Sequence, residues 1–123
     1  MAERRCLRCG MSTTALRFDL DQAPPRLNCS KCDENLYLQH DERFLTRDIA
    51  HGHETVARAR EKLEELLLEG WRGYYRGVRI VVGGGVIREE VLAQLRFYRQ
   101  SGSVREYRED SPNRGAIIAV LRN

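Results

Sequence analysis

Four cysteines, the only ones in the 123-residue chain, form two pairs, Cys6-x2-Cys9 and Cys29-x2-Cys32, with nineteen residues between the pairs. Each Cys-x-x-Cys can place two thiolates on one side of a tight turn, and two such turns complete a tetrahedral shell for Zn²⁺. Gly10 follows the first pair, where such a turn often needs a positive φ. A closed shell of four thiolates leaves no open coordination position. The sequence therefore predicts one structural Zn²⁺ bound by Cys6, Cys9, Cys29 and Cys32.

The alternative interpretation of the cysteines is a pair of disulfides. No apolar signal segment precedes Cys6, and a reducing cytosol would keep these thiols free. No stretch of the sequence approaches the length of a membrane span. We therefore expect a cytoplasmic protein with no membrane partner, and we favour the metal over the disulfides.

A second group that could do chemistry is Asp48-Ile-Ala-His51-Gly52-His53, at the expected end of a strand. A carboxylate and imidazoles can serve as general base, as its orienting partner, or as metal ligands. Asp48 and His51, with His53 as a third member, would suit phosphodiester cleavage beside a phosphate site. The alternative is that His51 caps the turn and that the other side chains are solvated.

A third group surrounds three successive glycines. A strand that feeds Gly83-Gly84-Gly85 into a helix directs backbone N–H groups outward, which suits a phosphate. Residues 71–88 contain four arginines and no acidic residue, and Trp71 and two tyrosines lie among them. Arginine contacts phosphates and aromatic faces stack on bases. The predicted nucleic-acid contacts are Arg72, Tyr74, Tyr75, Arg76, Arg79, Gly83, Gly84, Gly85 and Arg88. The alternatives are a tight turn without a ligand and aromatic rings that fold back onto the core.

The first part of the chain, residues 1–42, is predicted to form a zinc ribbon. A strand is expected over Thr13–Asp19, a break at Pro24-Pro25 and a short closing strand over Asn35–Gln39. A unit this small cannot bury a sufficient core, so the metal must hold it together.

Residues 43–123 alternate between strand-like and helix-like patterns. The first helix is expected to begin after Thr55 and to end at Gly70, and the second to follow Gly85 and to stop at Gly102. The expected strands are Arg43–Ala50, Val78–Val82, Ser103–Glu109 and Ala116–Leu121, with a loop over Trp71–Gly77 and a turn over Ser111–Arg114. The order β-α-β-α-β-β predicts an α+β chain, in which a two-layer α/β sandwich follows the ribbon.

Charge is distributed unevenly between these two parts. Residues 1–43 carry seven basic and seven acidic side chains, and residues 44–123 carry 14 and 11. A Zn²⁺ bound by four thiolates adds about −2 to the first part. The basic side chains expected to offset this charge are Arg4, Arg5, Arg8 and Lys31. The total is then close to neutral, which argues against a polybasic coat protein.

Residues 44–123 resemble a small MutS-related (Smr) domain. The resemblance rests on Asp48-Ile-Ala-His51-Gly52, on Thr55-Val56, on Val78-Arg-Ile-Val-Val-Gly-Gly-Gly85, and on Pro112-Asn-Arg-Gly115-Ala116-Ile-Ile-Ala-Val120. It implies a fold like the C-terminal domain of bacterial translation initiation factor 3. Members of the family bind nucleic acid, several nick DNA or cut RNA, and some act on stalled ribosomes. The resemblance therefore implies nucleic acid as a partner, and the ribosome or a stalled translation complex as a further one.

The chain departs from both hallmark motifs of that family, Leu-Asp-x-His and His-Gly-x-Gly. Asp48 lies three residues before His51 rather than two, and Val82 stands where the second motif has its histidine. The leading hypothesis is a nucleic-acid-binding protein with degenerate nuclease motifs. The alternatives are an active endonuclease that uses Asp48 and His51, and a protein-interaction module associated with the ribosome.

Overall fold

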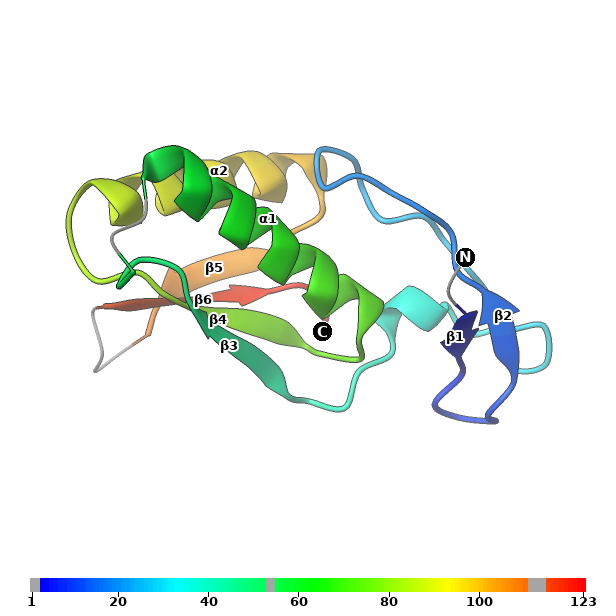
Figure 1. The fold of residues 1–123 in the computed structure, drawn as a ribbon. Coiled ribbons are helices and arrows are strands. Elements are labelled where there is room, and N and C mark those ends of the chain that lie inside the picture. The colour runs from blue at the N-terminus through cyan, green and yellow to red at the C-terminus, as the bar shows by residue number, and fades with distance from the viewer. Residues whose placement is uncertain (1–2, 53–54, 111–114) are drawn as a thin grey trace.

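The computed structural model describes residues 3–52, 55–110 and 115–123. Their elements form an α+β fold with two helices and two sheets, which confirms the predicted class (Figure 1). The elements, in chain order, are β1 (Glu3–Arg5), β2 (Ser12–Thr14), a 3-10 helix (Leu36–Leu38), β3 (Phe44–Asp48), α1 (Val56–Arg72), β4 (Gly77–Val81), α2 (Val86–Ser101), β5 (Glu106–Glu109) and β6 (Ala116–Val120).

The larger sheet has the strand order β3-β4-β6-β5, and both helices lie on one of its faces (Figure 1). β3 and β4 are parallel and joined through α1, whereas β6 runs antiparallel to its two neighbours. The two central strands are the most apolar, with Val78 opposite Ala119 and Ile80 opposite Ile117. All four side chains are fully buried, as expected for strands covered by helices.

The first helix begins where the sequence predicts and ends later. Thr55 caps its N-terminus, and the hydroxyl of Thr55 accepts a hydrogen bond from the N–H of Arg58. Gly70 does not end the helix, because it serves close packing: a Cβ there would lie 2.7 Å from Leu121 and 3.0 Å from Val78. The helix ends at Arg72 with Gly73 as its C-cap. Trp71 is therefore helical rather than part of a loop.

The N-terminal residues form little regular structure of their own. β1 and β2 pair antiparallel, and only the first two residues of the predicted strand Thr13–Asp19 belong to β2. The predicted closing strand Asn35–Gln39 is wrong, since Leu36–Leu38 is a 3-10 helix. The cause is local: the side-chain oxygen of Asn35 accepts the N–H of Tyr37 and favours a turn.

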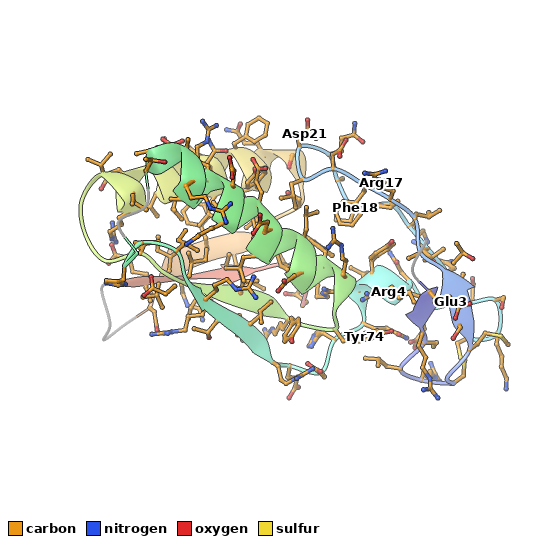
Figure 2. All side chains as sticks on the ribbon, in the orientation of Figure 1. Glu3, Arg4, Arg17, Phe18, Asp21 and Tyr74 are labelled. Carbon is orange, nitrogen blue, oxygen red and sulfur yellow. The ribbon has the colours of Figure 1, made fainter. Side chains whose placement is uncertain are left out.

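Residues 15–39 share a core with the larger sheet and its helices. The ring of Phe18 meets the rings of Tyr37 and Trp71 edge-on, with centroids 5.7 and 5.8 Å away. Leu20 belongs to the same buried apolar cluster, and its carbonyl accepts a hydrogen bond of 2.5 Å from the hydroxyl of Ser103. Figure 2 shows Phe18 pointing from this segment toward the helices. The predicted boundary near residue 42 is thus crossed by continuous packing.

The second helix, α2, follows the glycines and stops at Gly102, as predicted, and Gly102 adopts the left-handed conformation. The predicted turn Ser111–Arg114 and His53 lie outside the described residues. Neither helix in the described part of the chain is long and apolar enough to cross a membrane.

Candidate functional site

The four cysteines come together as the sequence predicts. Their sulfur atoms all lie within 4.8 Å of one another, and no disulfide joins them. Cys6 and Cys29 are buried, whereas Cys9 and Cys32 are partly exposed. The cluster is therefore positioned to hold one metal ion, and it shows free thiols rather than the alternative of two disulfides.

The two cysteine turns have matching backbone geometry. Gly10 has a φ of +81° and donates its N–H to the carbonyl of Cys6 at 2.8 Å. Asp33 has a φ of +60° and donates its N–H to the carbonyl of Cys29 at the same distance. The residue that follows each cysteine pair is thus left-handed. The sequence predicts this conformation at Gly10 but not at Asp33. A non-glycine residue in this conformation gives no clear signal in the sequence.

The sulfur atoms accept hydrogen bonds that favour thiolates. The side-chain amide of Gln39 donates to Cys6 Sγ at 3.3 Å, and the N–H groups of Lys31 and Cys32 each donate to Cys29 Sγ at 3.4 Å. The bond from Gln39 is the main reason that the pKa of Cys6 falls to about 6. In contrast, the hydrogen bond with Cys9 raises the pKa of Cys32 to about 12. Four crowded sulfurs cannot all ionise without a cation, so these donors fit a thiophilic metal.

The arginines near the cysteines play different parts. Arg8 forms an ion pair of 2.6 Å with Glu34, and this carboxylate, followed by the nearby sulfurs of Cys32 and Cys6, raises the pKa of Arg8. Arg4 was expected to offset the thiolates. Instead it is 3% exposed, and its guanidinium donates to the carbonyls of Leu36, Trp71, Arg72 and Gly73.

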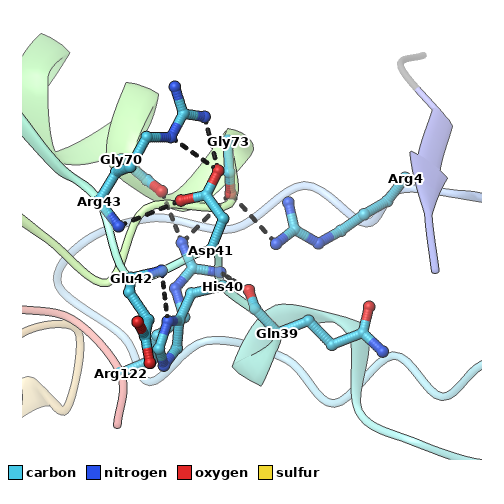
Figure 3. Close-up of polar contacts among 9 residues, drawn as sticks. All are labelled: Arg4, Gln39, His40, Asp41, Glu42, Arg43, Gly70, Gly73 and Arg122. Atoms are coloured by element: carbon cyan, nitrogen blue, oxygen red, sulfur yellow. Dashed lines mark hydrogen bonds and ion pairs between the residues drawn. The ribbon is translucent and has the colours of Figure 1, made fainter. Parts of the chain in front are cut away.

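A second buried arginine approaches the same helix end from the C-terminal part of the chain. Arg122 donates to the carbonyls of Gly70 at 2.5 Å, Gly73 at 3.3 Å and Gln39 at 3.2 Å (Figure 3). It also donates to the carbonyl of Tyr37 at 2.7 Å. The last carbonyls of a helix have no partner within it, and they favour cations. Arg4 and Arg122 thus cap α1 and tie the cysteine-bearing residues to it. The sequence contains no signal for this arrangement, which depends on tertiary contacts.

Asp48 and His51 form a hydrogen-bonded pair at the end of β3. Asp48 Oδ2 lies 2.5 Å from Nδ1 of His51, while Oδ1 accepts the N–H groups of Ala50 and His51. These contacts lower the pKa of Asp48, the N–H of Ala50 contributing most. A carboxylate at Nδ1 fixes the imidazole so that its other nitrogen, Nε2, is free to accept or donate a proton.

The pair faces the glycine turn. A Cβ built on Gly83 would lie 3.7 Å from Nε2 of His51, and both residues line an open pocket of about 530 Å³. Gly83 and Gly85 have φ values of +64° and +87°, so the turn requires glycine at both positions. Gly85 is the N-cap of α2 and provides no side-chain hydrogen bond. The first N–H groups of this helix therefore lack a side-chain partner at the cap.

The predicted nucleic-acid contacts do not form one patch. Arg72, Tyr74, Tyr75 and Arg76 precede β4, and Gly83, Gly84, Gly85 and Arg88 follow it, so β4 separates the two groups by about 20 Å. Arg79 forms an ion pair of 2.6 Å with Asp110, and Arg88 pairs with Glu109. Residues 71–88 contain no acidic side chain, but in the fold carboxylates from outside this segment pair with two of its four arginines.

The aromatic residues of the same segment face the protein. Trp71 is 2% exposed and donates its indole N–H to the carbonyl of Ser103 at 2.9 Å. The hydroxyl of Tyr74 donates to the carbonyl of Arg5 at 2.6 Å, and the ring of Tyr75 lies 4.9 Å from the guanidinium of Arg43. Trp71 thus follows the alternative in which an aromatic ring folds back onto the core.

No protein-family model matches the chain, and neither the curated proteins nor the solved structures give a significant match.

Proposed function

We propose that the protein binds nucleic acid, with a backbone phosphate at the glycine turn that begins α2. The observation that supports this most directly is the position of His51 Nε2 beside Gly83, at a helix N-terminus without a side-chain cap. Backbone N–H groups at such a terminus attract an anion, and His51 lines the same pocket. Gly84, Gly85 and Val86 are exposed, so a phosphate can reach the turn.

We further propose that the ion held by the cysteines is Zn²⁺, that residues 1–42 act as a zinc ribbon, and that residues 43–123 are an Smr-like two-layer sandwich in a cytoplasmic protein. Four sulfur ligands favour Zn²⁺ over harder divalent ions. The order β3-α1-β4-α2-β5-β6 is the order that the resemblance implies. The metal would hold the two cysteine turns together and would take no part in the chemistry at His51.

The binding proposal is tested by titrating labelled single-stranded and duplex nucleic acid at two salt concentrations. Val86, which is 72% exposed at the first position of α2, is changed to Glu so that a carboxylate competes for the helix N-terminus. Ala93→Glu, on an exposed position of the same helix, is the control with the same net charge. We expect Val86→Glu to weaken binding by about tenfold and Ala93→Glu to change it little. Absence of binding at low salt, or equal loss in both variants, contradicts the proposal.

A second candidate function is phosphodiester cleavage, favoured by the hydrogen bond between Asp48 and His51. With Nδ1 held by the carboxylate, Nε2 can take the proton of a hydroxyl as its oxygen attacks phosphorus. A new P–O bond forms, the P–O bond to the leaving oxygen breaks, and the N–H groups of α2 would stabilise the charge on the phosphate. Asp48 would hold the imidazole in place, and His51 would act as the base through Nε2.

Cleavage is tested with supercoiled plasmid and structured RNA. His51→Ala is expected to abolish cleavage, whereas His40→Ala, which lies outside the glycine-turn pocket, is expected to leave it unchanged. Equal cleavage by the His51 variant, or no cleavage by any form, rejects the catalytic role and leaves the binding proposal to its own test.

A further inference from the structure

A second open pocket, of about 490 Å³, lies at the opposite end of α2 from the glycine turn. It is formed where the segment around Pro24-Pro25 meets the C-terminal end of α2 and the end of β6. Because α2 has 16 residues and rises 1.5 Å per residue, this pocket lies about 24 Å from the glycine turn. The volume is within the usual range of small-molecule sites.

Three arginines and no acidic side chain line the pocket: Arg99, Arg105 and Arg122. Arg99 and Arg105 are exposed, and within residues 3–52, 55–110 and 115–123 neither forms an ion pair. Most other arginines of α1, α2 and the larger sheet behave differently: Arg47, Arg58, Arg60, Arg79, Arg88 and Arg108 each have a carboxylate partner. The pocket therefore contains uncompensated positive charge.

Arg122 is the buried member of this set. Its side chain is 1% exposed, its terminal nitrogens donate to backbone carbonyls, and its guanidinium stacks over the ring of Trp71 at 4.7 Å. Within the described part of the chain, Nε of Arg122 is the one buried side-chain polar atom without a hydrogen-bond partner. Burial, followed by repulsion from Arg4, lowers the pKa of Arg122 to about 9. An anion in the pocket would favour the charged form of this buried guanidinium.

The other side of the pocket has an apolar lining. It includes Pro24, Pro25, Tyr37 and Leu38, which is 57% exposed. Apolar side chains beside arginines suit a ligand that combines a ring with a phosphate.

We propose that this pocket binds a nucleotide, with the phosphate held by Arg99 and Arg105 and the base against Pro24, Pro25 and Leu38. The site is independent of the glycine turn. A free mononucleotide and the terminal nucleotide of a strand share the chemistry that would be recognised.

The test follows the indole N–H of Trp71, the single tryptophan of the chain and a pocket residue, in nitrogen–proton correlation spectra of the full metal-loaded protein. The probes are AMP, inorganic phosphate, adenosine and a short 5′-phosphorylated oligonucleotide. We expect saturable shifts with AMP, weaker binding of phosphate alone, and the weakest binding of adenosine. A stronger effect of the oligonucleotide than of AMP would assign the site to a strand end, and the reverse to a free nucleotide.

The variant Arg99→Glu/Arg105→Glu changes two exposed side chains and is compared with Arg96→Glu/Arg108→Glu, which alters the same net charge outside the pocket. We expect the first to weaken AMP binding by roughly tenfold or more, and the second to leave it nearly unchanged. Arg99→Gln/Arg105→Gln serves if the reversed charges disturb folding. Equal losses in both pairs, or no saturable shift with AMP in the unchanged protein, overturn the proposal. His51→Ala should retain AMP binding at the arginine-lined pocket even if it loses binding or cleavage at the glycine turn. The two proposals can therefore fail independently.

Discussion

Nε2 of His51 lies 3.7 Å from the position that a Cβ on Gly83 would occupy. The parallel pairing of β3 with β4 sets this distance, because Asp48 and Val81 are opposite each other at the ends of the two strands. After Asp48 the chain turns back through the hydrogen bonds that Oδ1 accepts, which brings His51 over the end of the sheet. After Val81 and Val82 the chain enters the glycines. The sheet register thus brings an imidazole to the beginning of α2.

Asp48 is expected to stabilise the fold in a pH-dependent manner. Its pKa is lowered in the folded protein, so its contribution is present above its unfolded pKa of about 3.9 and is lost as the pH falls through the folded value. Asp48→Asn keeps an acceptor for the two backbone N–H groups and loses the charge, whereas Asp48→Ala loses both. Because the side chain is 44% exposed, we expect Asp48→Asn to cost less than about 1 kcal/mol at pH 7.

Denaturant unfolding at pH 7 and below pH 4 measures these effects. The difference between Asp48→Asn and the unchanged protein should shrink at acid pH, while Asp48→Ala should remain less stable than Asp48→Asn at both. A cost of Asp48→Asn that is the same at both pH values would show that the charge plays no part.

Gly83→Ala and Gly84→Ala should differ although the positions are adjacent. Neither Cβ would clash, since the nearest atom to a Cβ at Gly83 is Nε2 of His51, and nothing lies within 4 Å at Gly84. Gly83 has a φ of +64°, however, and an L-residue in that conformation costs about 1–2 kcal/mol. We expect thermal unfolding to show that loss for Gly83→Ala and little change for Gly84→Ala. Equal stability of the two variants would contradict this account of the turn.

The features that the sequence predicted correctly depend on local spacing or on local signals. The cysteine cluster follows from two short motifs, and the Thr55 cap and the Gly102 stop follow from local helix signals. Errors arose where tertiary packing overrides a local signal. Gly70 resembles a helix stop, but it is a contact point for Val78 and Leu121, and the helix continues beyond it.

The function of Arg4 could not be predicted for the same reason. In the sequence it lies two residues from Cys6, and this spacing predicts a place beside the metal site. Its guanidinium instead reaches the end of α1, which lies far away in the sequence. This contact forms because residues 3–39 pack against the helices, and no spacing of residues in the sequence predicts it.

Arg4→Met should therefore destabilise the whole protein rather than the metal site alone. Methionine fills much of the same space but removes the hydrogen bonds that Arg4 donates to the carbonyls of Trp71 and Arg72. We expect a loss of roughly 2–4 kcal/mol in the free energy of unfolding. Arg5→Met is the matched control, because Arg5 is exposed and contacts Tyr74 only through its backbone. A global loss in Arg4→Met, seen as a shift of the entire denaturant transition, distinguishes this role from simple weakening of metal binding. Similar stabilities of the two variants would contradict it.

Metal binding should release protons in a number that Gln39 controls. All four sulfurs must be thiolates in the complex, so affinity rises with pH and falls as acid protonates them. The hydrogen bond from Gln39 lowers the pKa of Cys6 to about 6, so Cys6 is already ionised at pH 7.5, whereas Cys32, with a pKa of about 12, must lose its proton. We therefore expect fewer than four protons per Zn²⁺ at that pH. Gln39→Leu removes the donor, raises the pKa of Cys6 and should increase the number of protons released.

Calorimetric titration of the metal-free protein with Zn²⁺ in buffers of different ionisation enthalpy counts these protons. His40→Leu, a neighbour that contacts no sulfur in the described residues, is the control and should match the unchanged protein. Release that is identical in the Gln39 and His40 variants would show that the amide does not set the ionisation of Cys6.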